Sequence, residues 1–273
     1  MLFKKKRKSV SDKKIYDKPK DVKQILDEQI ETSLHEFNRS NIGLFISSFA
    51  GGMEVGFSVL LMGTIFTLFA HDVSPELLHV LLSFCYPIGF IFVIIGRSEL
   101  FTEHTALAVL PVLNRSVGIS SLMILWGLVY GGNLLGGYLF SLLISQIGIM
   151  NGFIYDDAFL HLANELTHHK WYNILLSGMV AGWMMGLLGW LLTSSQETIS
   201  RIFVIILVTA TIGIAGLHHC IVGSIEVFSG MLVHDSIVFY DYLHFLVWAT
   251  LGNILGGVVF VALLKFGHIR MLR

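Results

Sequence analysis

Two polar clusters interrupt long apolar stretches of this chain. The first, residues 96–105, reads GRSELFTEHT and contains Arg97, Glu99 and Glu103. The second, residues 215–226, reads AGLHHCIVGSIE and contains His218 and His219. A charged side chain near the centre of a bilayer costs about 3 kcal/mol or more, so the charged residues cannot face lipid. We expect both clusters to line an interior cavity, where irregular polar backbone is tolerated.

Proton exchange is the chemistry that these residue types favour. An imidazole donates hydrogen bonds and titrates near neutral pH, so His219 is the candidate to exchange a proton with a solute in the cavity. Helices that begin at the clusters would point amide N–H groups and positive dipole ends into the cavity, which favours an anion or a polarised neutral acid. A histidine in a membrane helix can also serve in packing alone. We expect Arg97 and Glu99 to neutralise each other as a structural ion pair.

The elements that position these residues are membrane helices. Hydrophobic residues make up 54% of the chain, mean hydropathy is +0.73 and 14% of residues are charged, against about 25% charged in an average soluble domain. Six apolar runs approach or exceed the roughly 20 residues that a crossing requires. They are residues 43–70, 77–113 with an interruption, 117–147, 172–193, 202–233 with an interruption, and 243–266. This pattern predicts an all-α polytopic membrane protein and excludes an ordinary soluble enzyme.

The basic residues predict the orientation. Eleven of the 18 Lys and Arg residues lie in residues 1–40, and with six crossings only Lys170 falls in a loop on the opposite side. The positive-inside rule therefore places both termini in the cytoplasm of a bacterial inner membrane. We expect residues 1–40 to form a separate N-terminal segment with an amphipathic helix in the membrane interface, because apolar residues recur there at helical spacing. Residues 41–273 form the transmembrane domain. The basic segment indicates no nucleic-acid partner.

An internal repeat relates the two halves. GNLLGG at residues 132–137 returns as GNILGG at residues 252–257, an offset of 120 that also pairs Glu99 with His219. Repeat 1 covers about residues 43–147 and repeat 2 about 172–266. Because each repeat has three crossings, the second must be inverted, which predicts a solute site near the midplane at the broken second and fifth helices, as in aquaporin-like architectures. Asn133 and Asn253 occupy equivalent positions, and their amides are expected to support the interrupted backbone.

Specific motifs resemble the formate/nitrite transporter family, and within it the YfdC-like bacterial branch. They are LFTEHTALAVLPVLNR from Leu100, HCIVGSIE from His219 and the two GN motifs, and the resemblance covers about residues 43–266. It implies a homopentamer with one pore in each protomer and no cofactor. The implied permeants are small monovalent anions such as formate, nitrite or hydrosulfide, which cross as their neutral acids.

The resemblance also implies roles for individual residues. The family's Leu-Phe-Thr triplet falls on Leu100, Phe101 and Thr102, its central histidine on His219, and its outer constriction on Tyr86 and Phe90. Thr102 and neighbouring loop amides would hydrogen-bond the permeant. Three positions depart from the family pattern: Glu99 stands where the family has Asp, Leu166 where better-known members have a vestibule lysine, and His218 where the anion channels have an acid.

Three other functions fit parts of the sequence. A pore for a neutral solute such as ammonia would also use an inverted repeat, although the aquaporin Asn-Pro-Ala motif is absent. A membrane metalloenzyme could use His218, His219 and Cys220, but adjacent helical residues rarely converge on one metal. A second possible metal site has helical spacing: His161, Glu165, His168 and His169. Lastly, a receptor or scaffold that transports nothing would retain the charged loop for structure alone.

Overall fold

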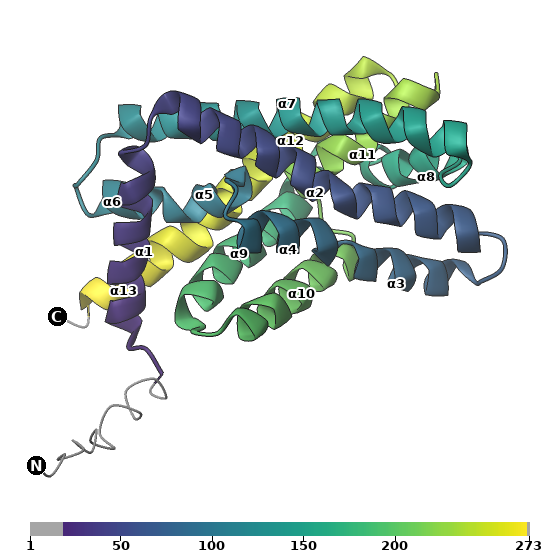
Figure 1. Cartoon of the computed structure of the whole chain (residues 1–273). Helices are drawn as coiled ribbons and strands as arrows, with labels where there is room; N and C mark the ends of the chain where they lie inside the picture. Colours follow the sequence, from purple (N-terminus) through teal and green to yellow (C-terminus); the bar gives the residue numbers. More distant parts are fainter. Residues whose placement is uncertain (1–18, 272–273) are drawn as a thin grey trace, which may run out of the picture.

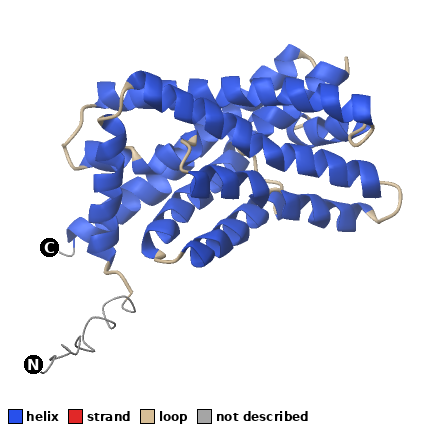
Figure 2. Cartoon of the chain, in the orientation of Figure 1, coloured by secondary structure: helices blue, strands red, loops and turns tan. Residues whose placement is uncertain are grey.

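The computed structural model describes residues 19–271, and this part of the chain consists of helices, turns and loops (Figure 2). Five helices are long and apolar enough to cross a membrane: Asn41–Phe69, Pro75–Gly96, Ile119–Asn151, Trp171–Ser194 and Phe239–Ile269. The all-helical prediction is confirmed. The expected fifth crossing consists of two shorter apolar helices, and the part of the N-terminal segment at residues 1–18 lies outside the described residues.

The order of the elements follows the apolar runs and their interruptions. They are α1 (Val22–Phe37), α2 (Asn41–Phe69), α3 (Pro75–Cys85), α4 (Pro87–Gly96), α5 (Phe101–Leu107), α6 (Val109–Leu113), α7 (Ile119–Asn151), α8 (Asp156–Thr167), α9 (Trp171–Ser194), α10 (Thr198–Ile214), α11 (Cys220–Val233), α12 (Phe239–Leu255), the π-helix η2 (Gly256–Leu263) and α13 (Leu264–Met271). Serine side chains begin α2 and α3, because Ser40 accepts from Gly43 N–H and Ser74 accepts from Leu77 N–H.

Glycines bring the long helices into backbone contact. α2 packs along α7, and α9 packs along α12. A Cβ atom added to Gly52 would lie 2.1 Å from the Asn133 carbonyl oxygen, and one added to Gly182 would lie 2.2 Å from the Asn253 carbonyl oxygen. Small residues at such crossings allow the close packing that associates helices in lipid. The same contacts hold the two asparagines in place.

The Gly182 contact predicts a stability defect. Gly182→Ala should destabilise the protein by about 1–3 kcal/mol, because the methyl group overlaps a backbone oxygen that cannot move without shifting α12. The midpoint of thermal unfolding in detergent would measure this loss. Gly127→Ala is the control, since a Cβ there meets nothing within 4 Å. Equal midpoints for the two variants would show that the α9–α12 contact is looser than the structure has it.

Two shorter helices lie at opposite ends of the molecule. Figure 1 shows α1 crossing the ends of the long helices steeply, near the C-terminus, whereas α8 lies at the far end. α1 contacts α6 and α9, and Lys20, just before it, donates to the Thr193 carbonyl oxygen at 2.7 Å. The Lys20 ammonium also bonds the Glu28 carboxylate and lowers the pKa of that group. α8 packs on α11 and α2. A position of α1 in the membrane interface stays a prediction.

The two interruptions are built alike. α4 ends with Arg97 in the left-handed region at φ 66°, and α10 is followed by Gly216 at φ 58°. The next amides reach back five residues at both places, from Ser98 to the Val93 carbonyl and from Leu217 to the Ile212 carbonyl, each at 3.0 Å. This is the Schellman ending, which glycine adopts freely and which an arginine adopts only with strain. Both helices therefore stop before irregular segments.

Candidate functional site

The two interruptions meet at a hydrogen bond between His219 and Thr102. His219 Nε2 lies 2.8 Å from Thr102 Oγ1, and the imidazole is 1% exposed. His219 also caps α11, because its Nδ1 accepts the Val222 N–H at 3.3 Å. A ring nitrogen that accepts carries no proton, so in the neutral imidazole Nε2 bears the hydrogen and donates it to Thr102. Protonation of Nδ1 would break the cap.

An aromatic column continues from His219. Phe90 contacts the imidazole edge-on with ring centroids 5.2 Å apart, and Tyr86 packs on Phe90 at 5.3 Å. We call this set the neck: Tyr86, Phe90, Leu100, Thr102 and His219, all of which are buried. Leu100 is the N-cap of α5. The neck contains no aspartate, glutamate, lysine or arginine, and its five side chains are buried.

Phe101 lies outside the neck. Its ring contacts Trp126 and Tyr130 of α7, with centroids 6.1 and 4.8 Å away. The amides at the start of α11 are also already bonded, Cys220 N–H to Asn253 and Val222 N–H to His219. These two amides therefore have partners within the protein, and the expectation that loop amides near Thr102 bond a permeant stays a prediction.

Asn133 of α7 holds the first irregular segment. Its Oδ1 accepts the Phe101 N–H at 2.8 Å, and its Nδ2 donates to the carbonyl oxygens of Glu99 at 2.8 Å and Ser48 at 2.7 Å. One amide thus satisfies two backbone groups of the irregular segment, which has no helical partners for them, and links that segment to the Ser48 carbonyl of α2.

Asn253 of α12 does the same for the second segment. Its Oδ1 accepts from Cys220 N–H at 2.8 Å, and its Nδ2 donates to the carbonyls of His218 and Gly178, both at 2.9 Å. These bonds make His218 the counterpart of Glu99, so the 120-residue pairing of Glu99 with His219 is wrong by one position. The second repeat has one extra residue between the irregular segment and its asparagine. Asn253 lies 33 residues after Cys220, whereas Asn133 lies 32 residues after Phe101.

Glu99 is neutralised by residues that the sequence analysis did not select. Its carboxylate bonds Arg39, in the linker between α1 and α2, and His104 Nε2 at 2.6 Å. Arg39 also bonds Glu36 of α1 at 2.6 Å. The expected Arg97–Glu99 ion pair is therefore wrong, because Arg97 takes no part in the ion pairs found among residues 19–271. Glu99 instead ties the first irregular segment to the α1 end.

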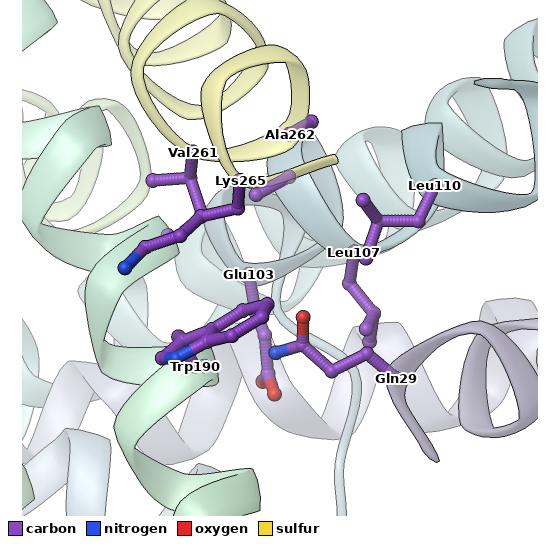
Figure 3. A pocket seen from close by; sticks show the side chains of 11 residues that line it. Gln29, Glu103, Leu107, Leu110, Trp190, Val261, Ala262 and Lys265 are labelled. Atoms are coloured by element: carbon purple, nitrogen blue, oxygen red, sulfur yellow. The ribbon is translucent and has the colours of Figure 1, made fainter. Parts of the chain in front are cut away.

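A cavity of about 890 Å³ opens on this side of the neck. It is lined by α1, α10 and the first irregular segment, including Arg39, Arg97, Glu99, Glu103, His104 and Arg201. Glu103 also lines a smaller adjoining cavity with space for about one water molecule (Figure 3). There the Lys265 ammonium lies 5.1 Å from the Trp190 ring centroid, and Gln29 lines the same small cavity as Glu103 (Figure 3). The larger cavity contains both acidic and basic side chains and lies between α1 and the neck, and we call it the vestibule.

His218 points away from the neck, toward α8, α9 and α12. Its Nδ1 lies 2.9 Å from Ser177 Oγ, and its ring contacts those of His169 and Phe245. Within the described part of the chain, no three His, Cys, Asp or Glu side chains converge as metal ligands would. Neither proposed metal cluster is therefore assembled here.

Comparisons with known proteins agree with this geometry. The family model described as formate/nitrite transporter matches residues 23–267. Inner membrane protein YfdC of Escherichia coli (strain K12) is 31% identical over 238 residues, which are 86% of this chain and 74% of that protein.

Two solved structures share the fold. A structure described as an FNT family ion channel has a TM-score of 0.81 at 22% identity, covering 90% of this chain and 99% of its own. A pentameric formate channel with formate bound has a TM-score of 0.73 at 24% identity, covering 85% and 98%. With 245 of its residues, 23–267, matched by the family model, this chain belongs to the formate/nitrite transporter family.

Proposed function

We propose that this protein is a channel for small monovalent anions, such as formate or nitrite, which pass the neck as neutral weak acids. The observation that carries the proposal is the His219–Thr102 hydrogen bond at the meeting point of the two irregular segments. It is the place in the neck where a side chain that exchanges protons faces a hydroxyl group. Family membership supports the substrate class, and no catalytic step is involved.

Protonation solves the energetic problem of the neck. An anion entering a passage lined by buried, mainly apolar side chains loses its hydration without compensation, whereas a protonated weak acid loses far less. In the proposed cycle the imidazole gains a proton, the Nδ1 cap to Val222 opens, and Nε2–H passes a proton to the anion. The neutral acid then moves past Phe90 or Thr102 and leaves the imidazole with its hydrogen on Nδ1. Nε2 takes up a proton and Nδ1 releases its own to water, which restores the Nδ1 cap to Val222.

The proposed architecture has six crossings in two inverted repeats, with both termini in the cytoplasm of the inner membrane. It is supported by the matching Schellman endings, by Asn133 and Asn253 making the same three bonds, and by α1 and α8 at opposite ends. A homopentamer with one pore in each protomer is proposed from the pentameric formate channel that shares the fold. Residues 1–40 are proposed as the interfacial segment.

Stopped-flow flux in proteoliposomes tests the function. Formate, nitrite, acetate, hydrosulfide and methylammonium would be compared between pH 5 and pH 8, with protein-free vesicles as the control. We expect formate and nitrite flux to increase as the pH falls, because more of the solute reaches the neck with a proton available. Flux of methylammonium alone would establish the neutral-amine pore instead. Absence of all flux would leave a scaffold with the channel fold.

A further inference from the structure

A proline bend lies between the two aromatic side chains of the neck. α3 and α4 meet at Pro87, within an apolar stretch that otherwise runs continuously over Pro75–Gly96. Proline has no N–H to donate and its ring clashes with the carbonyl four residues earlier, so it bends a helix. Tyr86 stands just before Pro87 and Phe90 three residues after it, with ring centroids 5.3 Å apart. The angle of the bend therefore affects the separation of these two rings.

One hydroxyl group of α2 bridges the bend. Ser58 Oγ donates to the Tyr86 carbonyl at 2.5 Å and accepts the Gly89 N–H at 3.0 Å, and the Ser58 side chain is fully buried. In lipid, backbone groups near a proline must find partners within the protein, and serine hydroxyls are among the groups that serve. Ser58 thus bonds one backbone group on each side of Pro87 and joins both to α2.

Close packing also holds the far side of the bend against α2. A Cβ atom added to Gly89 would lie 2.4 Å from the Val55 carbonyl oxygen and 2.7 Å from Ser58 Oγ. α4 therefore rests on the α2 backbone at the residue just before Phe90, which is fully buried. On the near side, the Tyr86 carbonyl is joined to α2 through the Ser58 hydroxyl. A change at this hydroxyl would move Tyr86 with respect to Phe90.

The matching helix of the other half, α10, is not interrupted. It too ends in a Schellman turn before an irregular segment, but it is a single helix over Thr198–Ile214 and contains no proline. The irregular segments and the asparagines that hold them are built alike in both halves, so those features belong to the scaffold. The bend is confined to the helix that supplies Tyr86 and Phe90, which points to a task in the neck.

We propose that Ser58 is a positioning residue that sets the width of the neck and, through it, the size of the weak acid that passes. Its two hydrogen bonds hold the Tyr86 ring at its present separation from Phe90, which admits a one-carbon acid and disfavours a larger one. The hydroxyl touches no solute and acts through the Tyr86 ring. The inference deepens the proposed function and rests on it for transport, whereas the position of Tyr86 can be tested without transport.

The ratio of acetate flux to formate flux tests this role, because the amount of folded protein in the vesicles cancels from the ratio. Ser58→Ala should raise the ratio about tenfold, within the range that one extra methylene is worth in a fitted apolar pocket. Ser58→Cys fills the same space with a thiol that bonds weakly, and should raise the ratio less, by about threefold.

Ser48→Ala is the matched control for these variants. It removes an equally buried hydroxyl from the same helix, but that hydroxyl bonds the Leu44 carbonyl within α2 at 2.7 Å. The acetate-to-formate ratio of Ser48→Ala should equal that of wild type. An unchanged ratio in both Ser58 variants, or an equal rise in Ser48→Ala, would overturn the positioning role.

Fluorine NMR follows Tyr86 independently of transport. In detergent-solubilised protein labelled with fluorotyrosine, the resonance that Tyr86→Phe removes should shift in Ser58→Ala and stay in place in Ser48→Ala. That shift, in a protein whose wild type transports neither acid, would retain the positioning of Tyr86 by Ser58 and reject the channel. Formate transport by the wild type, with the Tyr86 resonance unmoved in Ser58→Ala, would reject the positioning role and retain the channel.

Discussion

Replacing His219 with Asn is expected to lower formate flux at pH 5.5 about 100-fold and to remove its acid dependence. The amide oxygen of Asn can accept the Val222 N–H and keep the cap of α11, but the side chain has no proton to exchange near neutral pH. General acid–base groups contribute about 10²–10⁴-fold to the steps that they assist. Stopped-flow flux across pH 5 to 8 would measure the effect.

A second variant separates proton exchange from packing. His219→Phe keeps the ring that contacts Phe90 but loses both the cap and the Thr102 bond, so it should transport no better than His219→Asn and unfold at a lower temperature. His71→Asn changes an exposed histidine outside the neck and should behave as wild type. Wild-type flux with unchanged acid dependence in His219→Asn would remove His219 from the mechanism.

Asn253→Leu should cost several kcal/mol of stability. Leucine is similar in size to asparagine but leaves two backbone groups of the irregular segment without this partner, Cys220 N–H and the His218 carbonyl, and removes the bond to the Gly178 carbonyl of α9. A buried polar group that loses its partner costs about 1–3 kcal/mol, and no water within the bilayer core can replace it. The unfolding midpoint and the yield of monodisperse protein in detergent would measure the loss.

Two further asparagine variants serve as a matched comparison and a control for Asn253→Leu. Asn133→Leu should cause a similar loss, because it removes two bonds to the first irregular segment and one to the Ser48 carbonyl of α2. Asn151→Leu, at the exposed end of α7, should leave the midpoint within about 0.5 kcal/mol of wild type. A midpoint unchanged by Asn253→Leu would mean that the segment before α11 is held by contacts other than this amide.

The fold was largely predictable because lipid imposes simple rules on sequence. The expected run 43–70 corresponds to α2 (Asn41–Phe69), and 117–147 corresponds to α7 (Ile119–Asn151). The break between α3 and α4 was not predicted. Pro87 provides no N–H there, and Ser58 compensates by donating to the Tyr86 carbonyl and accepting the Gly89 N–H. That partner lies 28 residues away in the chain, so no local pattern revealed the break.

The site was predictable where a polar residue stood out against apolar neighbours. His219, Thr102, Asn133 and Asn253 drew attention for this reason, and the structure brings His219 to Thr102, while their roles remain proposals. Arg39, Ser177 and His169 were missed because polar residues are ordinary at helix ends and linkers, so their partners at Glu99 and His218 depend on packing alone. His104 was also missed. It lies in the polar cluster at residues 96–105, where Arg97 rather than His104 was expected to neutralise Glu99.

The neck without charged side chains has a consequence for selectivity. A passage of this kind does not sort solutes by the sign of their charge, because it has no fixed counter-charge to offer, and under the proposed function it sorts them by basicity. Anions of weak acids accept a proton readily and pass, whereas anions of strong acids, such as chloride or nitrate, hold a proton so weakly that they stay outside at any physiological pH. The cell would then set the direction of net flow through its pH gradient as much as through solute concentration.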